Sequence, residues 1–454
     1  MRFRLAVFTC SLLLSLASFA GTFSAGGPVS TNNDDTCDIG LYPAATLLLP
    51  YFDVDLTNAG GETTLFTITN TSPEERIAAV TLWTDLAYPV ITFPIYLTGY
   101  DVQSINLYDV IQNGQIAPPR GTGTTVSHTG RFSKRNFELD RSDCASLRGE
   151  LPEITISKLK QAFVLGRVPA EGSNPQCVTV GTAHSDAHAA GFVTVDVVRT
   201  CDTRSPDDAA YWSSVIAYDN VLTGEWIQVN RSLKFAEGNQ MVHIRAIPEG
   251  EDTATRLALP EIYRSNFPRT FYGRFTGNTR SDGRQPLPSR IASRWILGGP
   301  SEFNSVITIW REAQTGAGAS CIAYAGNANV PVLELVTFDE AENAVGAVFE
   351  EPQFPMPPVS GEMIVIPAQR IEMGGLIPLP DPNAVSGWIY MNLDAPGTTV
   401  PLSQAWVVTT MRAEGQASVS FDAIALGNGC TPAAQNSEIT GGPAIVGPSG
   451  NVNP

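Results

Sequence analysis

The stretch CVTVGTAHSDAHAAGFVTVDVVRTC, residues 177–201, contains the clearest strand pattern of the chain. In GFVTVDVV (191–198), valines alternate with Thr194 and Asp196. Successive side chains of a strand point to opposite faces, so this pattern predicts a strand with one apolar face. We predict that CVTVG and GFVTVDVV form a hairpin whose connection holds the histidines.

The same alternation recurs along most of the chain. Short β-branched and aromatic runs are separated by Gly, Pro, Asn or Asp, as in antiparallel sandwiches. One stretch, LPEITISKLKQAFVLG, instead has apolar residues at helical spacing. We therefore predict a mostly β protein with two antiparallel β-sandwich domains, immunoglobulin-like or jelly-roll-like, and one short helix near residues 151–166. The main strand candidates are ETTLFTITN, RIAAVTLWT, EWIQVN, MVHIRAI, SVITIW, VLELVTF, GWIYMNL and AWVVTTM.

The N-terminus has the form of a secretory signal peptide. Arg2 and Arg4 precede an apolar run from Leu5 to Ala20, which ends in small residues suited to cleavage. We predict a signal peptide over residues 1–20, whose apolar run of 16 residues is too short to span a bilayer. The mature chain is predicted to be secreted or periplasmic and to have no integral membrane segment.

The length of the remaining chain favours two domains. A polar stretch at residues 248–261 marks the predicted boundary. We predict an N-terminal β-sandwich domain over residues 37–250 and a C-terminal β-sandwich domain over residues 251–432. A flexible Gly/Pro tail is predicted over residues 433–454.

Charge and cysteine content agree with export. The chain has 45 acidic and 28 basic side chains, a net charge of −17, which disfavours binding to nucleic acid. Six of the seven cysteines follow the signal peptide, an even number that suggests disulfides in an oxidising compartment. Cys177 and Cys201 are the predicted pair, and the other pairings stay open.

Several longer stretches resemble a family of uncharacterised secreted bacterial β-rich proteins. They are YLTGYDVQSINLYDV, GFVTVDVV followed by a cysteine, YDNVLTGEW, FYGRF, GGPSEFNSVITIWR and QAWVVTTMRAEGQASVSFDAI. Together they extend over most of the mature chain. The resemblance implies an exported, β-rich bacterial protein. It implies no activity and no functional residues, because the family has no assigned activity.

His184, Asp186 and His188 are the first candidate site. On a strand the three side chains would share one face, and this set of ligands suits Zn²⁺ or Fe²⁺. We favour the alternative that they belong to a polar connection, because the surrounding alanines and Gly191 oppose a strand. Acidic stretches offer oxygen ligands for Ca²⁺ but also suit turns: residues 31–38, 51–56 and 338–343. We predict no cofactor, with Ca²⁺ or Zn²⁺ as the alternative.

No stretch predicts a catalytic nucleophile. The chain lacks the G-x-S-x-G and H-E-x-x-H motifs, and all six mature cysteines can pair. A carboxylate pair could act as in glycosidases, but the acidic residues are too numerous for the sequence to single out two. We predict no catalytic residue and favour a protein that is not an enzyme.

Tryptophans mark the first predicted binding surface. Trp83, Trp226 and Trp388 each alternate with aliphatic residues in a strand candidate, and Tyr390 shares the face of Trp388. If the aliphatic faces form the cores, these aromatic side chains point outward and can bind a glycan or a protein partner. The alternative is that another part of the chain covers the aromatic faces, since large aromatics are mostly buried.

An arginine-rich segment, residues 263–295, provides a second predicted binding surface. It holds seven arginines and one acid, with Tyr and Phe between them. We assign Arg269, Arg274 and Arg280 to binding, through charge pairing with an acidic ligand. The alternative is that these arginines pair with the acidic excess inside the protein, especially at the domain junction.

The favoured function is an exported, non-enzymatic β-sandwich protein that binds a glycan or a protein partner at the cell exterior. A secreted hydrolase or metal-dependent enzyme is the second hypothesis, with His184, Asp186 and His188 or a carboxylate pair as its site. A structural envelope component that contacts copies of itself is the third. Exposure of the tryptophans, metal content and oligomeric state distinguish the three hypotheses.

Overall fold

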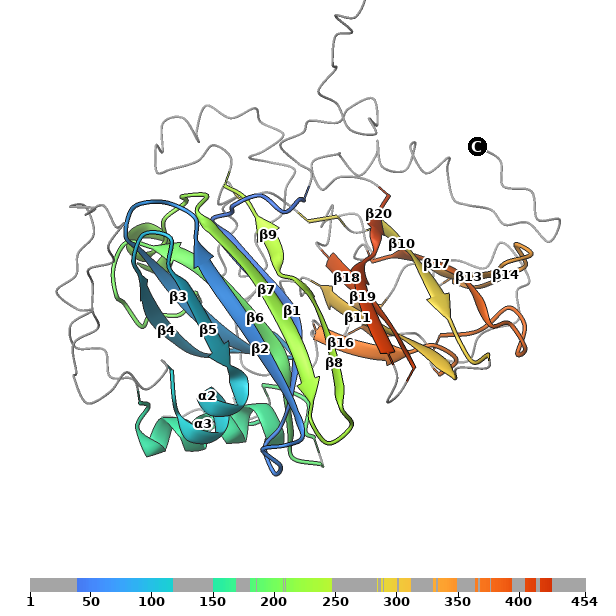
Figure 1. Ribbon diagram of the computed structural model, residues 1–454, viewed down its shortest axis with the longest axis horizontal. Coiled ribbons are helices and arrows are strands. Elements are labelled where there is room, and N and C mark those ends of the chain that lie inside the picture. Colours follow the sequence, from blue (N-terminus) through green and yellow to red (C-terminus); the bar gives the residue numbers. More distant parts are fainter. Residues whose placement is uncertain are drawn as a thin grey trace, which may run out of the picture.

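The protein is mostly β, as the computed structural model shows (Figure 1). Four antiparallel sheets form two sandwiches, and a short two-stranded ribbon accompanies them. The predicted fold class is therefore confirmed. The structure describes residues 39–116, 150–168, 180–184, 186–206, 208, 210–246, 284, 287–288, 290–299, 302–311, 330–331, 334–348, 364–365, 368–375, 377–393, 405–413 and 417–426.

The N-terminal sandwich consists of a five-stranded and a four-stranded sheet. Their facing sides form one core, which includes Leu49 and Val195 of the first sheet and Phe66 and Ile68 of the second. The first sheet contains, in spatial order, β4 (Pro89–Leu97), β3 (Arg76–Thr84), β6 (His188–Val198), β1 (Thr46–Asp55) and β9 (Val242–Ile244). The second contains β5 (Val102–Asn106), β2 (Glu62–Asn70), β7 (Leu222–Asn230) and β8 (Phe235–Gln240).

The C-terminal sandwich is built in the same way and lies beside the first (Figure 1). Its core includes Ile307 and Val407 of one sheet and Trp295 and Ile389 of the other. The first sheet contains β16 (Ala368–Glu372), β11 (Phe303–Arg311), β18 (Ala405–Ala413) and β19 (Ala417–Asp422). The second contains β14 (Ala344–Val348), β13 (Glu334–Asp339), β17 (Ser386–Asn392), β10 (Arg290–Ile296) and β20 (Ile424–Ala425), and the ribbon pairs β12 (Val330–Pro331) with β15 (Ile364–Val365).

Two α-helices lie at one end of the N-terminal sandwich (Figure 1). α3 (Glu153–Leu165) confirms the predicted helix, and its Phe163 packs edge-on against Phe52 of β1 at 5.5 Å between ring centroids. α2 (Leu107–Asn113) was not expected from the sequence, and a π-helical turn spans Tyr211–Val215. None of the helices in the described residues is long and apolar enough to cross a bilayer.

β6 begins earlier than the sequence predicts. It starts at His188 rather than Gly191, and it pairs with β1 and β3 instead of with the residues before it. Residues 180–184 form no strand, so the predicted hairpin is wrong in the described residues. Gly191 suits this strand because of close packing: a Cβ there would lie 2.0 Å from the carbonyl oxygen of Trp83, far inside van der Waals contact.

Several predictions fall outside the described residues. These are the signal peptide, the domain boundary at residues 248–261 and the Gly/Pro tail. Cys201 is buried and disulfide-bonded, but Cys177 is not among the described residues. The Cys177–Cys201 pairing therefore stays a prediction.

The two sandwiches meet at the outer face of the first N-terminal sheet. Trp83 of β3 stacks on Phe192 of β6, with ring centroids 5.5 Å apart. Phe192 in turn meets Trp310 of β11 edge to face at 6.0 Å. Leu48 of β1 and Ala368 of β16 belong to the same buried cluster. The C-terminal sandwich thus covers a face that an isolated N-terminal sandwich would expose.

Candidate functional site

The structure contradicts the solvent exposure predicted for Trp83. This side chain does lie opposite Val80 and Leu82, as predicted, but the C-terminal sandwich covers it and only 1% of Trp83 is exposed. Its Nε1 donates a hydrogen bond to Thr194 Oγ1 at 2.8 Å. The alternative interpretation, that another part of the chain covers the aromatic face, is therefore correct here.

The prediction for Trp226 is wrong for a different reason. Trp226 and Gln228 of β7 point into the N-terminal sandwich and are 4% and 3% exposed, whereas Ile227 is 45% exposed on the outside. The alternation is real, but the two faces are reversed. Gln228 can lie inside because its Nε2 donates to the Glu62 carboxylate at the end of the sandwich.

Among the predicted binding residues that the structure describes, Trp388 and Tyr390 are partly exposed. They lie on the outer face of β17, and the intervening Ile389 is fully buried. Trp388 stacks on Phe338 of β13, with centroids 3.7 Å apart and ring planes within 9°. On its other side, Trp388 is paired in register with Arg294 of β10. The pattern of aliphatic side chains inside and aromatic side chains outside is confirmed in this strand.

His184, Asp186 and His188 do not form the predicted set of metal ligands. His184 Nε2 lies 3.9 Å from Asp85 Oδ2, and Asp186 is exposed. The candidate metal site required all three residues on one strand, but β6 starts only at His188, so the two earlier residues do not lie on a strand. The interpretation as a polar connection holds for His184 and Asp186.

The arginine-rich segment is described only in part. Three predicted binding residues lie outside the described residues: Arg269, Arg274 and Arg280. Arg284 and Arg294 of the same segment are described, and both are paired internally. Arg284 Nη1 donates to Asp196 Oδ1 at 2.8 Å, with both side chains buried, and Arg294 pairs with a surface glutamate. The alternative of internal pairing holds for these two arginines.

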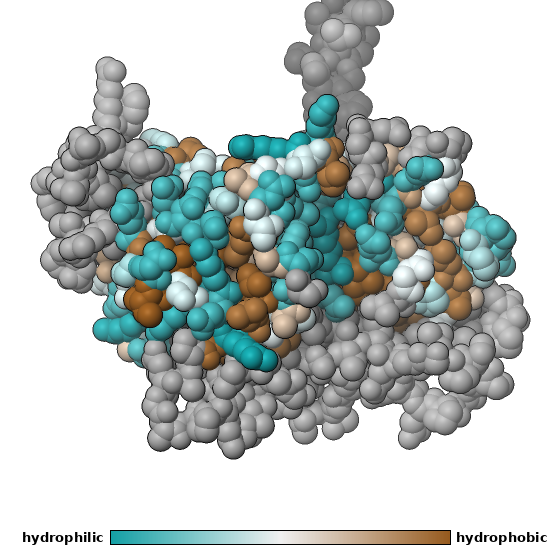
Figure 2. Space-filling view, turned by 90° about the horizontal axis from the view of Figure 1, so that it is seen from below, coloured by the Kyte–Doolittle hydropathy of each residue, from teal (hydrophilic) through white to brown (hydrophobic). Residues whose placement is uncertain are grey.

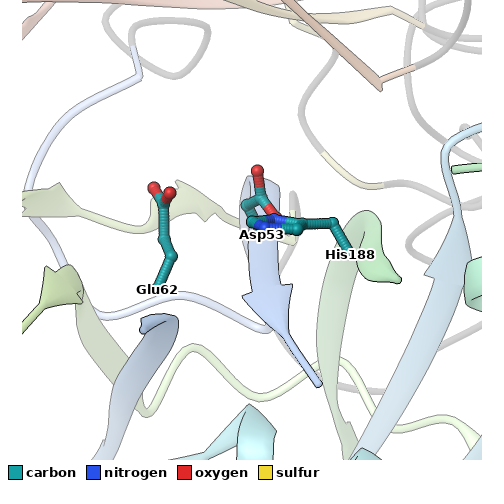
Figure 3. Close-up of side chains that lie close together, drawn as sticks. All are labelled: Asp53, Glu62 and His188. Atoms are coloured by element: carbon teal, nitrogen blue, oxygen red, sulfur yellow. The ribbon is translucent and has the colours of Figure 1, made fainter. Parts of the chain in front are cut away.

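A polar cluster lies where β1, β2 and β6 approach the C-terminal sandwich. Asp53, Glu62 and His188 each offer a potential ligand atom, and these atoms all lie within 4.8 Å of one another. His188 Nδ1 and Asp53 Oδ1 are 2.6 Å apart. Figure 3 shows the carboxylates of Asp53 and Glu62 beside each other, with the His188 ring against Asp53. Within the described part of the chain, no other three His, Cys, Asp or Glu side chains come this close.

The strand pattern explains how these side chains converge. β1 directs Phe52 and Val54 into the core, which turns Asp53 to the opposite face. His188 is the first residue of β6, the strand that pairs with this part of β1. Glu62 is the first residue of β2 in the second sheet. The cluster therefore sits at strand ends, where the two sheets of the sandwich come together.

Arg370 connects this cluster to the C-terminal sandwich. It lies on β16, and its Nη2 donates to Glu237 Oε1 of β8 at 2.5 Å. Its Nη1 donates to Gln228 Oε1 at 3.0 Å and lies 3.4 Å from Glu62 Oε1. One guanidinium thus bridges carboxylates from two strands of the N-terminal sandwich.

The electrostatics of the cluster reflect its surplus of carboxylates. The hydrogen bond to Asp53 raises the pKa of His188 from 6.5 to about 9 despite partial burial. Burial and the charge of Asp53 raise the pKa of Glu62 and of the neighbouring Tyr51. Burial alone would lower the pKa of Arg370, but the nearby carboxylates raise it. His188 is therefore a cation at neutral pH, paired with Asp53.

The sequence points to two of these residues but not to their arrangement. His188 belongs to the predicted trio, and Asp53 lies in the acidic stretch at residues 51–56. Nothing in the sequence marks Glu62 or Arg370, because their proximity depends on how two sheets and two sandwiches pack. Chemically, one imidazole and two carboxylates can hold a divalent cation or share a proton.

No protein-family model, no curated protein and no solved structure matches this chain. The resemblance to secreted bacterial proteins therefore stays a prediction.

Proposed function

We propose that this chain is an exported, non-enzymatic binding protein whose protein partner docks on the outer face of the second C-terminal sheet. The observation that carries the proposal is the Phe338–Trp388 stack with a partly exposed tryptophan, bordered by the exposed Arg294. Export is the expectation from the N-terminal sequence.

The register of the strands arranges this outer face in two rows. One row contains Phe338, Trp388 and Arg294, and the other contains Val336, Tyr390 and Ala292. Ile424 of β20 extends the second row and is 67% exposed. Apolar surface is also visible over the C-terminal strands when the molecule is seen from below (Figure 2). Aromatic residues bordered by arginine are typical of protein interfaces.

A protein partner fits this face better than a glycan. Sugar rings bind to the open face of an aromatic ring, but Phe338 covers one face of Trp388 in a nearly parallel stack. Paired residues of neighbouring strands stand side by side on a sheet, and Phe338 is buried, so the stack presents mainly the edge of the partly exposed Trp388 to the solvent. The ring edge of Trp388 together with the exposed Ile424 suits burial against apolar side chains of another protein.

Site-specific photo-cross-linking in exporting cells tests the proposal. A photoreactive phenylalanine analogue replaces Trp388 in one variant and Ile227, an exposed residue of the N-terminal sandwich, in the control. We expect an adduct with one other protein from position 388 and none from position 227. The purified partner should then bind Trp388→Ala at least about tenfold more weakly than wild type, as an interface hot spot requires. Unchanged binding by Trp388→Ala would refute the proposal, and an adduct of the chain with itself would favour the structural role.

A further inference from the structure

The polar cluster at the junction has the ligand set of a transition-metal site. Asp53, Glu62 and His188 provide two carboxylate oxygens and one imidazole nitrogen within 4.8 Å, from three different strands. Their side chains are about a fifth to a quarter exposed, so an ion could enter from solvent. Three protein ligands of this kind, with further positions left to water, suit Zn²⁺, whereas Ca²⁺ prefers oxygen ligands throughout.

A second observation concerns Glu237, which shares Arg370 with Glu62 of the cluster. Glu237 is 5% exposed, and its Oε2 is buried with no hydrogen-bond partner among the described residues. Its other oxygen shares Arg370 with Glu62. A buried carboxylate oxygen without a partner is costly and rare in proteins. The Arg370 guanidinium is therefore shared by two carboxylates, and the Asp53 carboxylate is paired with His188.

The carboxylates of Asp53 and Glu62 lie close together, and the nearest guanidinium is shared with Glu237. A metal ion would add positive charge between Asp53 and Glu62.

We propose that Asp53, Glu62 and His188 bind one Zn²⁺ ion at the junction of the two sandwiches. The ion takes the place of the proton between His188 Nδ1 and Asp53 Oδ1. These atoms are 2.6 Å apart, and tetrahedral ligands of zinc at bond lengths of about 2.0–2.2 Å are roughly 3.4 Å apart. An adjustment of less than about 1 Å in two partly exposed side chains opens the site. This proposal does not depend on the protein partner proposed above.

The proposed site shares Glu62 with the contact between the cluster and Arg370 of β16. A cation on Glu62 competes with Arg370 for the same carboxylate oxygen and leaves the guanidinium to Glu237 and Gln228. Metal binding is therefore coupled to a contact between the two sandwiches.

Titration calorimetry of the full chain with Zn²⁺ tests the proposal. The chain is first freed of metal with a chelator, and the same titration with Ca²⁺ identifies an oxygen-only site. We expect one zinc ion per chain. In His188→Ala the zinc affinity should fall by more than about 100-fold, because losing even a hydrogen-bond partner of a metal ligand lowers metal affinity by about 10- to 100-fold. His184→Ala is the matched control, because His184 is also a partly buried histidine beside an aspartate. The zinc affinity of this variant should match that of wild type within about twofold.

Other results of the same experiment would overturn the proposal. Absence of stoichiometric zinc binding, or equal losses in His184→Ala and His188→Ala, would exclude this ligand set. Calcium binding that survives His188→Ala would show an oxygen site instead of a zinc site. Glu62→Gln, which keeps its size and one acceptor, checks that a loss of binding does not come from misfolding. Its melting temperature without metal should stay close to that of wild type.

Discussion

Trp83→Ala tests the central correction that the structure makes to the sequence-based hypothesis. If Trp83 were an exposed binding residue, its removal would leave stability nearly unchanged. The structure instead places it between the sandwiches, 1% exposed, stacked on Phe192 and hydrogen-bonded to Thr194. The substitution should therefore destabilise the fold.

The magnitude follows from these contacts. Core Trp→Ala substitutions cost about 3–5 kcal/mol, which includes the cavity that is left. Loss of the bond from Nε1 to Thr194 Oγ1 adds about 1 kcal/mol, because the hydroxyl group stays buried. The stack with Phe192 contributes about 0.5–1.5 kcal/mol, part of it already counted in the burial. We expect the free energy of unfolding to fall by about 4–6 kcal/mol in total.

Urea unfolding of the full chain, followed by circular dichroism, measures this change. Trp388→Ala is the matched control, because Trp388 is also stacked on a phenylalanine but lies partly exposed on an outer face. The control should lose less than about 2 kcal/mol. A loss below about 1 kcal/mol in Trp83→Ala, or a loss no larger than that of the control, would refute the packing described here.

Two further predictions concern charges at the junction. In chelator, the stability difference between wild type and His188→Gln should be about 1–2 kcal/mol at pH 6 after allowance for solvent screening. Because the pKa of His188 is raised from 6.5 to about 9 in the folded protein, the stability difference should reach its full size below pH 6.5 and disappear above pH 9. A difference in urea unfolding that stays constant with pH would contradict this expectation. Arg284→Met should lower the free energy of unfolding by about 3–5 kcal/mol, since it leaves the Asp196 carboxylate buried without its cation. Arg294→Met, whose ion pair is more than half exposed, should change it by less than about 1 kcal/mol, and equal effects would count against the buried pair.

Alternation is a local property, and it predicted many of the strands, although β1, β8 and β10 were not among the strand candidates. β2, β3, β11 and β17 all lie in stretches where apolar and polar residues alternate. The start of β6 was missed because Ala189, Ala190 and Gly191 have little strand propensity of their own. Tertiary packing decides their conformation, since β6 is hydrogen-bonded on both sides by β1 and β3.

Alternation shows that a strand has two faces, but it does not show what covers each face. In β3 the second face is covered by the other sandwich, and Trp83 becomes part of the core. In β7 the face with Trp226 and Gln228 is the inner one, since polar side chains at the end of the sandwich find partners there. In β17 the expected arrangement holds, because Ile389 packs into the core. These three outcomes depend on contacts between residues far apart in the sequence.

The same limit applies to the candidate zinc site. His188 and Asp53 are 135 residues apart and meet only because β1 and β6 are neighbours in one sheet. Glu62 comes from the other sheet, and Arg370 comes from the other sandwich. Spacing within a short stretch offered His184 and Asp186 as alternative ligands beside His188, whereas strand register and sheet packing decide which residues meet in the fold.

The buried carboxylates of the N-terminal sandwich argue that the two sandwiches are one folding unit. Asp196 is fully buried and is paired with Arg284, which lies beyond the predicted domain boundary. Glu237 is nearly as buried and is paired with Arg370 of β16. A chain cut near residue 250 would keep both carboxylates and lose both guanidinium groups, as well as the cover over Trp83. Desolvated carboxylates without cations must either take up protons or draw water into the fold, and both cost stability. Thr46 and Tyr211 also donate hydrogen bonds to Asp196, each at 2.6 Å, but they carry no charge. In a chain with a net charge of −17, the two arginines thus supply the positive charge that compensates these buried acidic side chains.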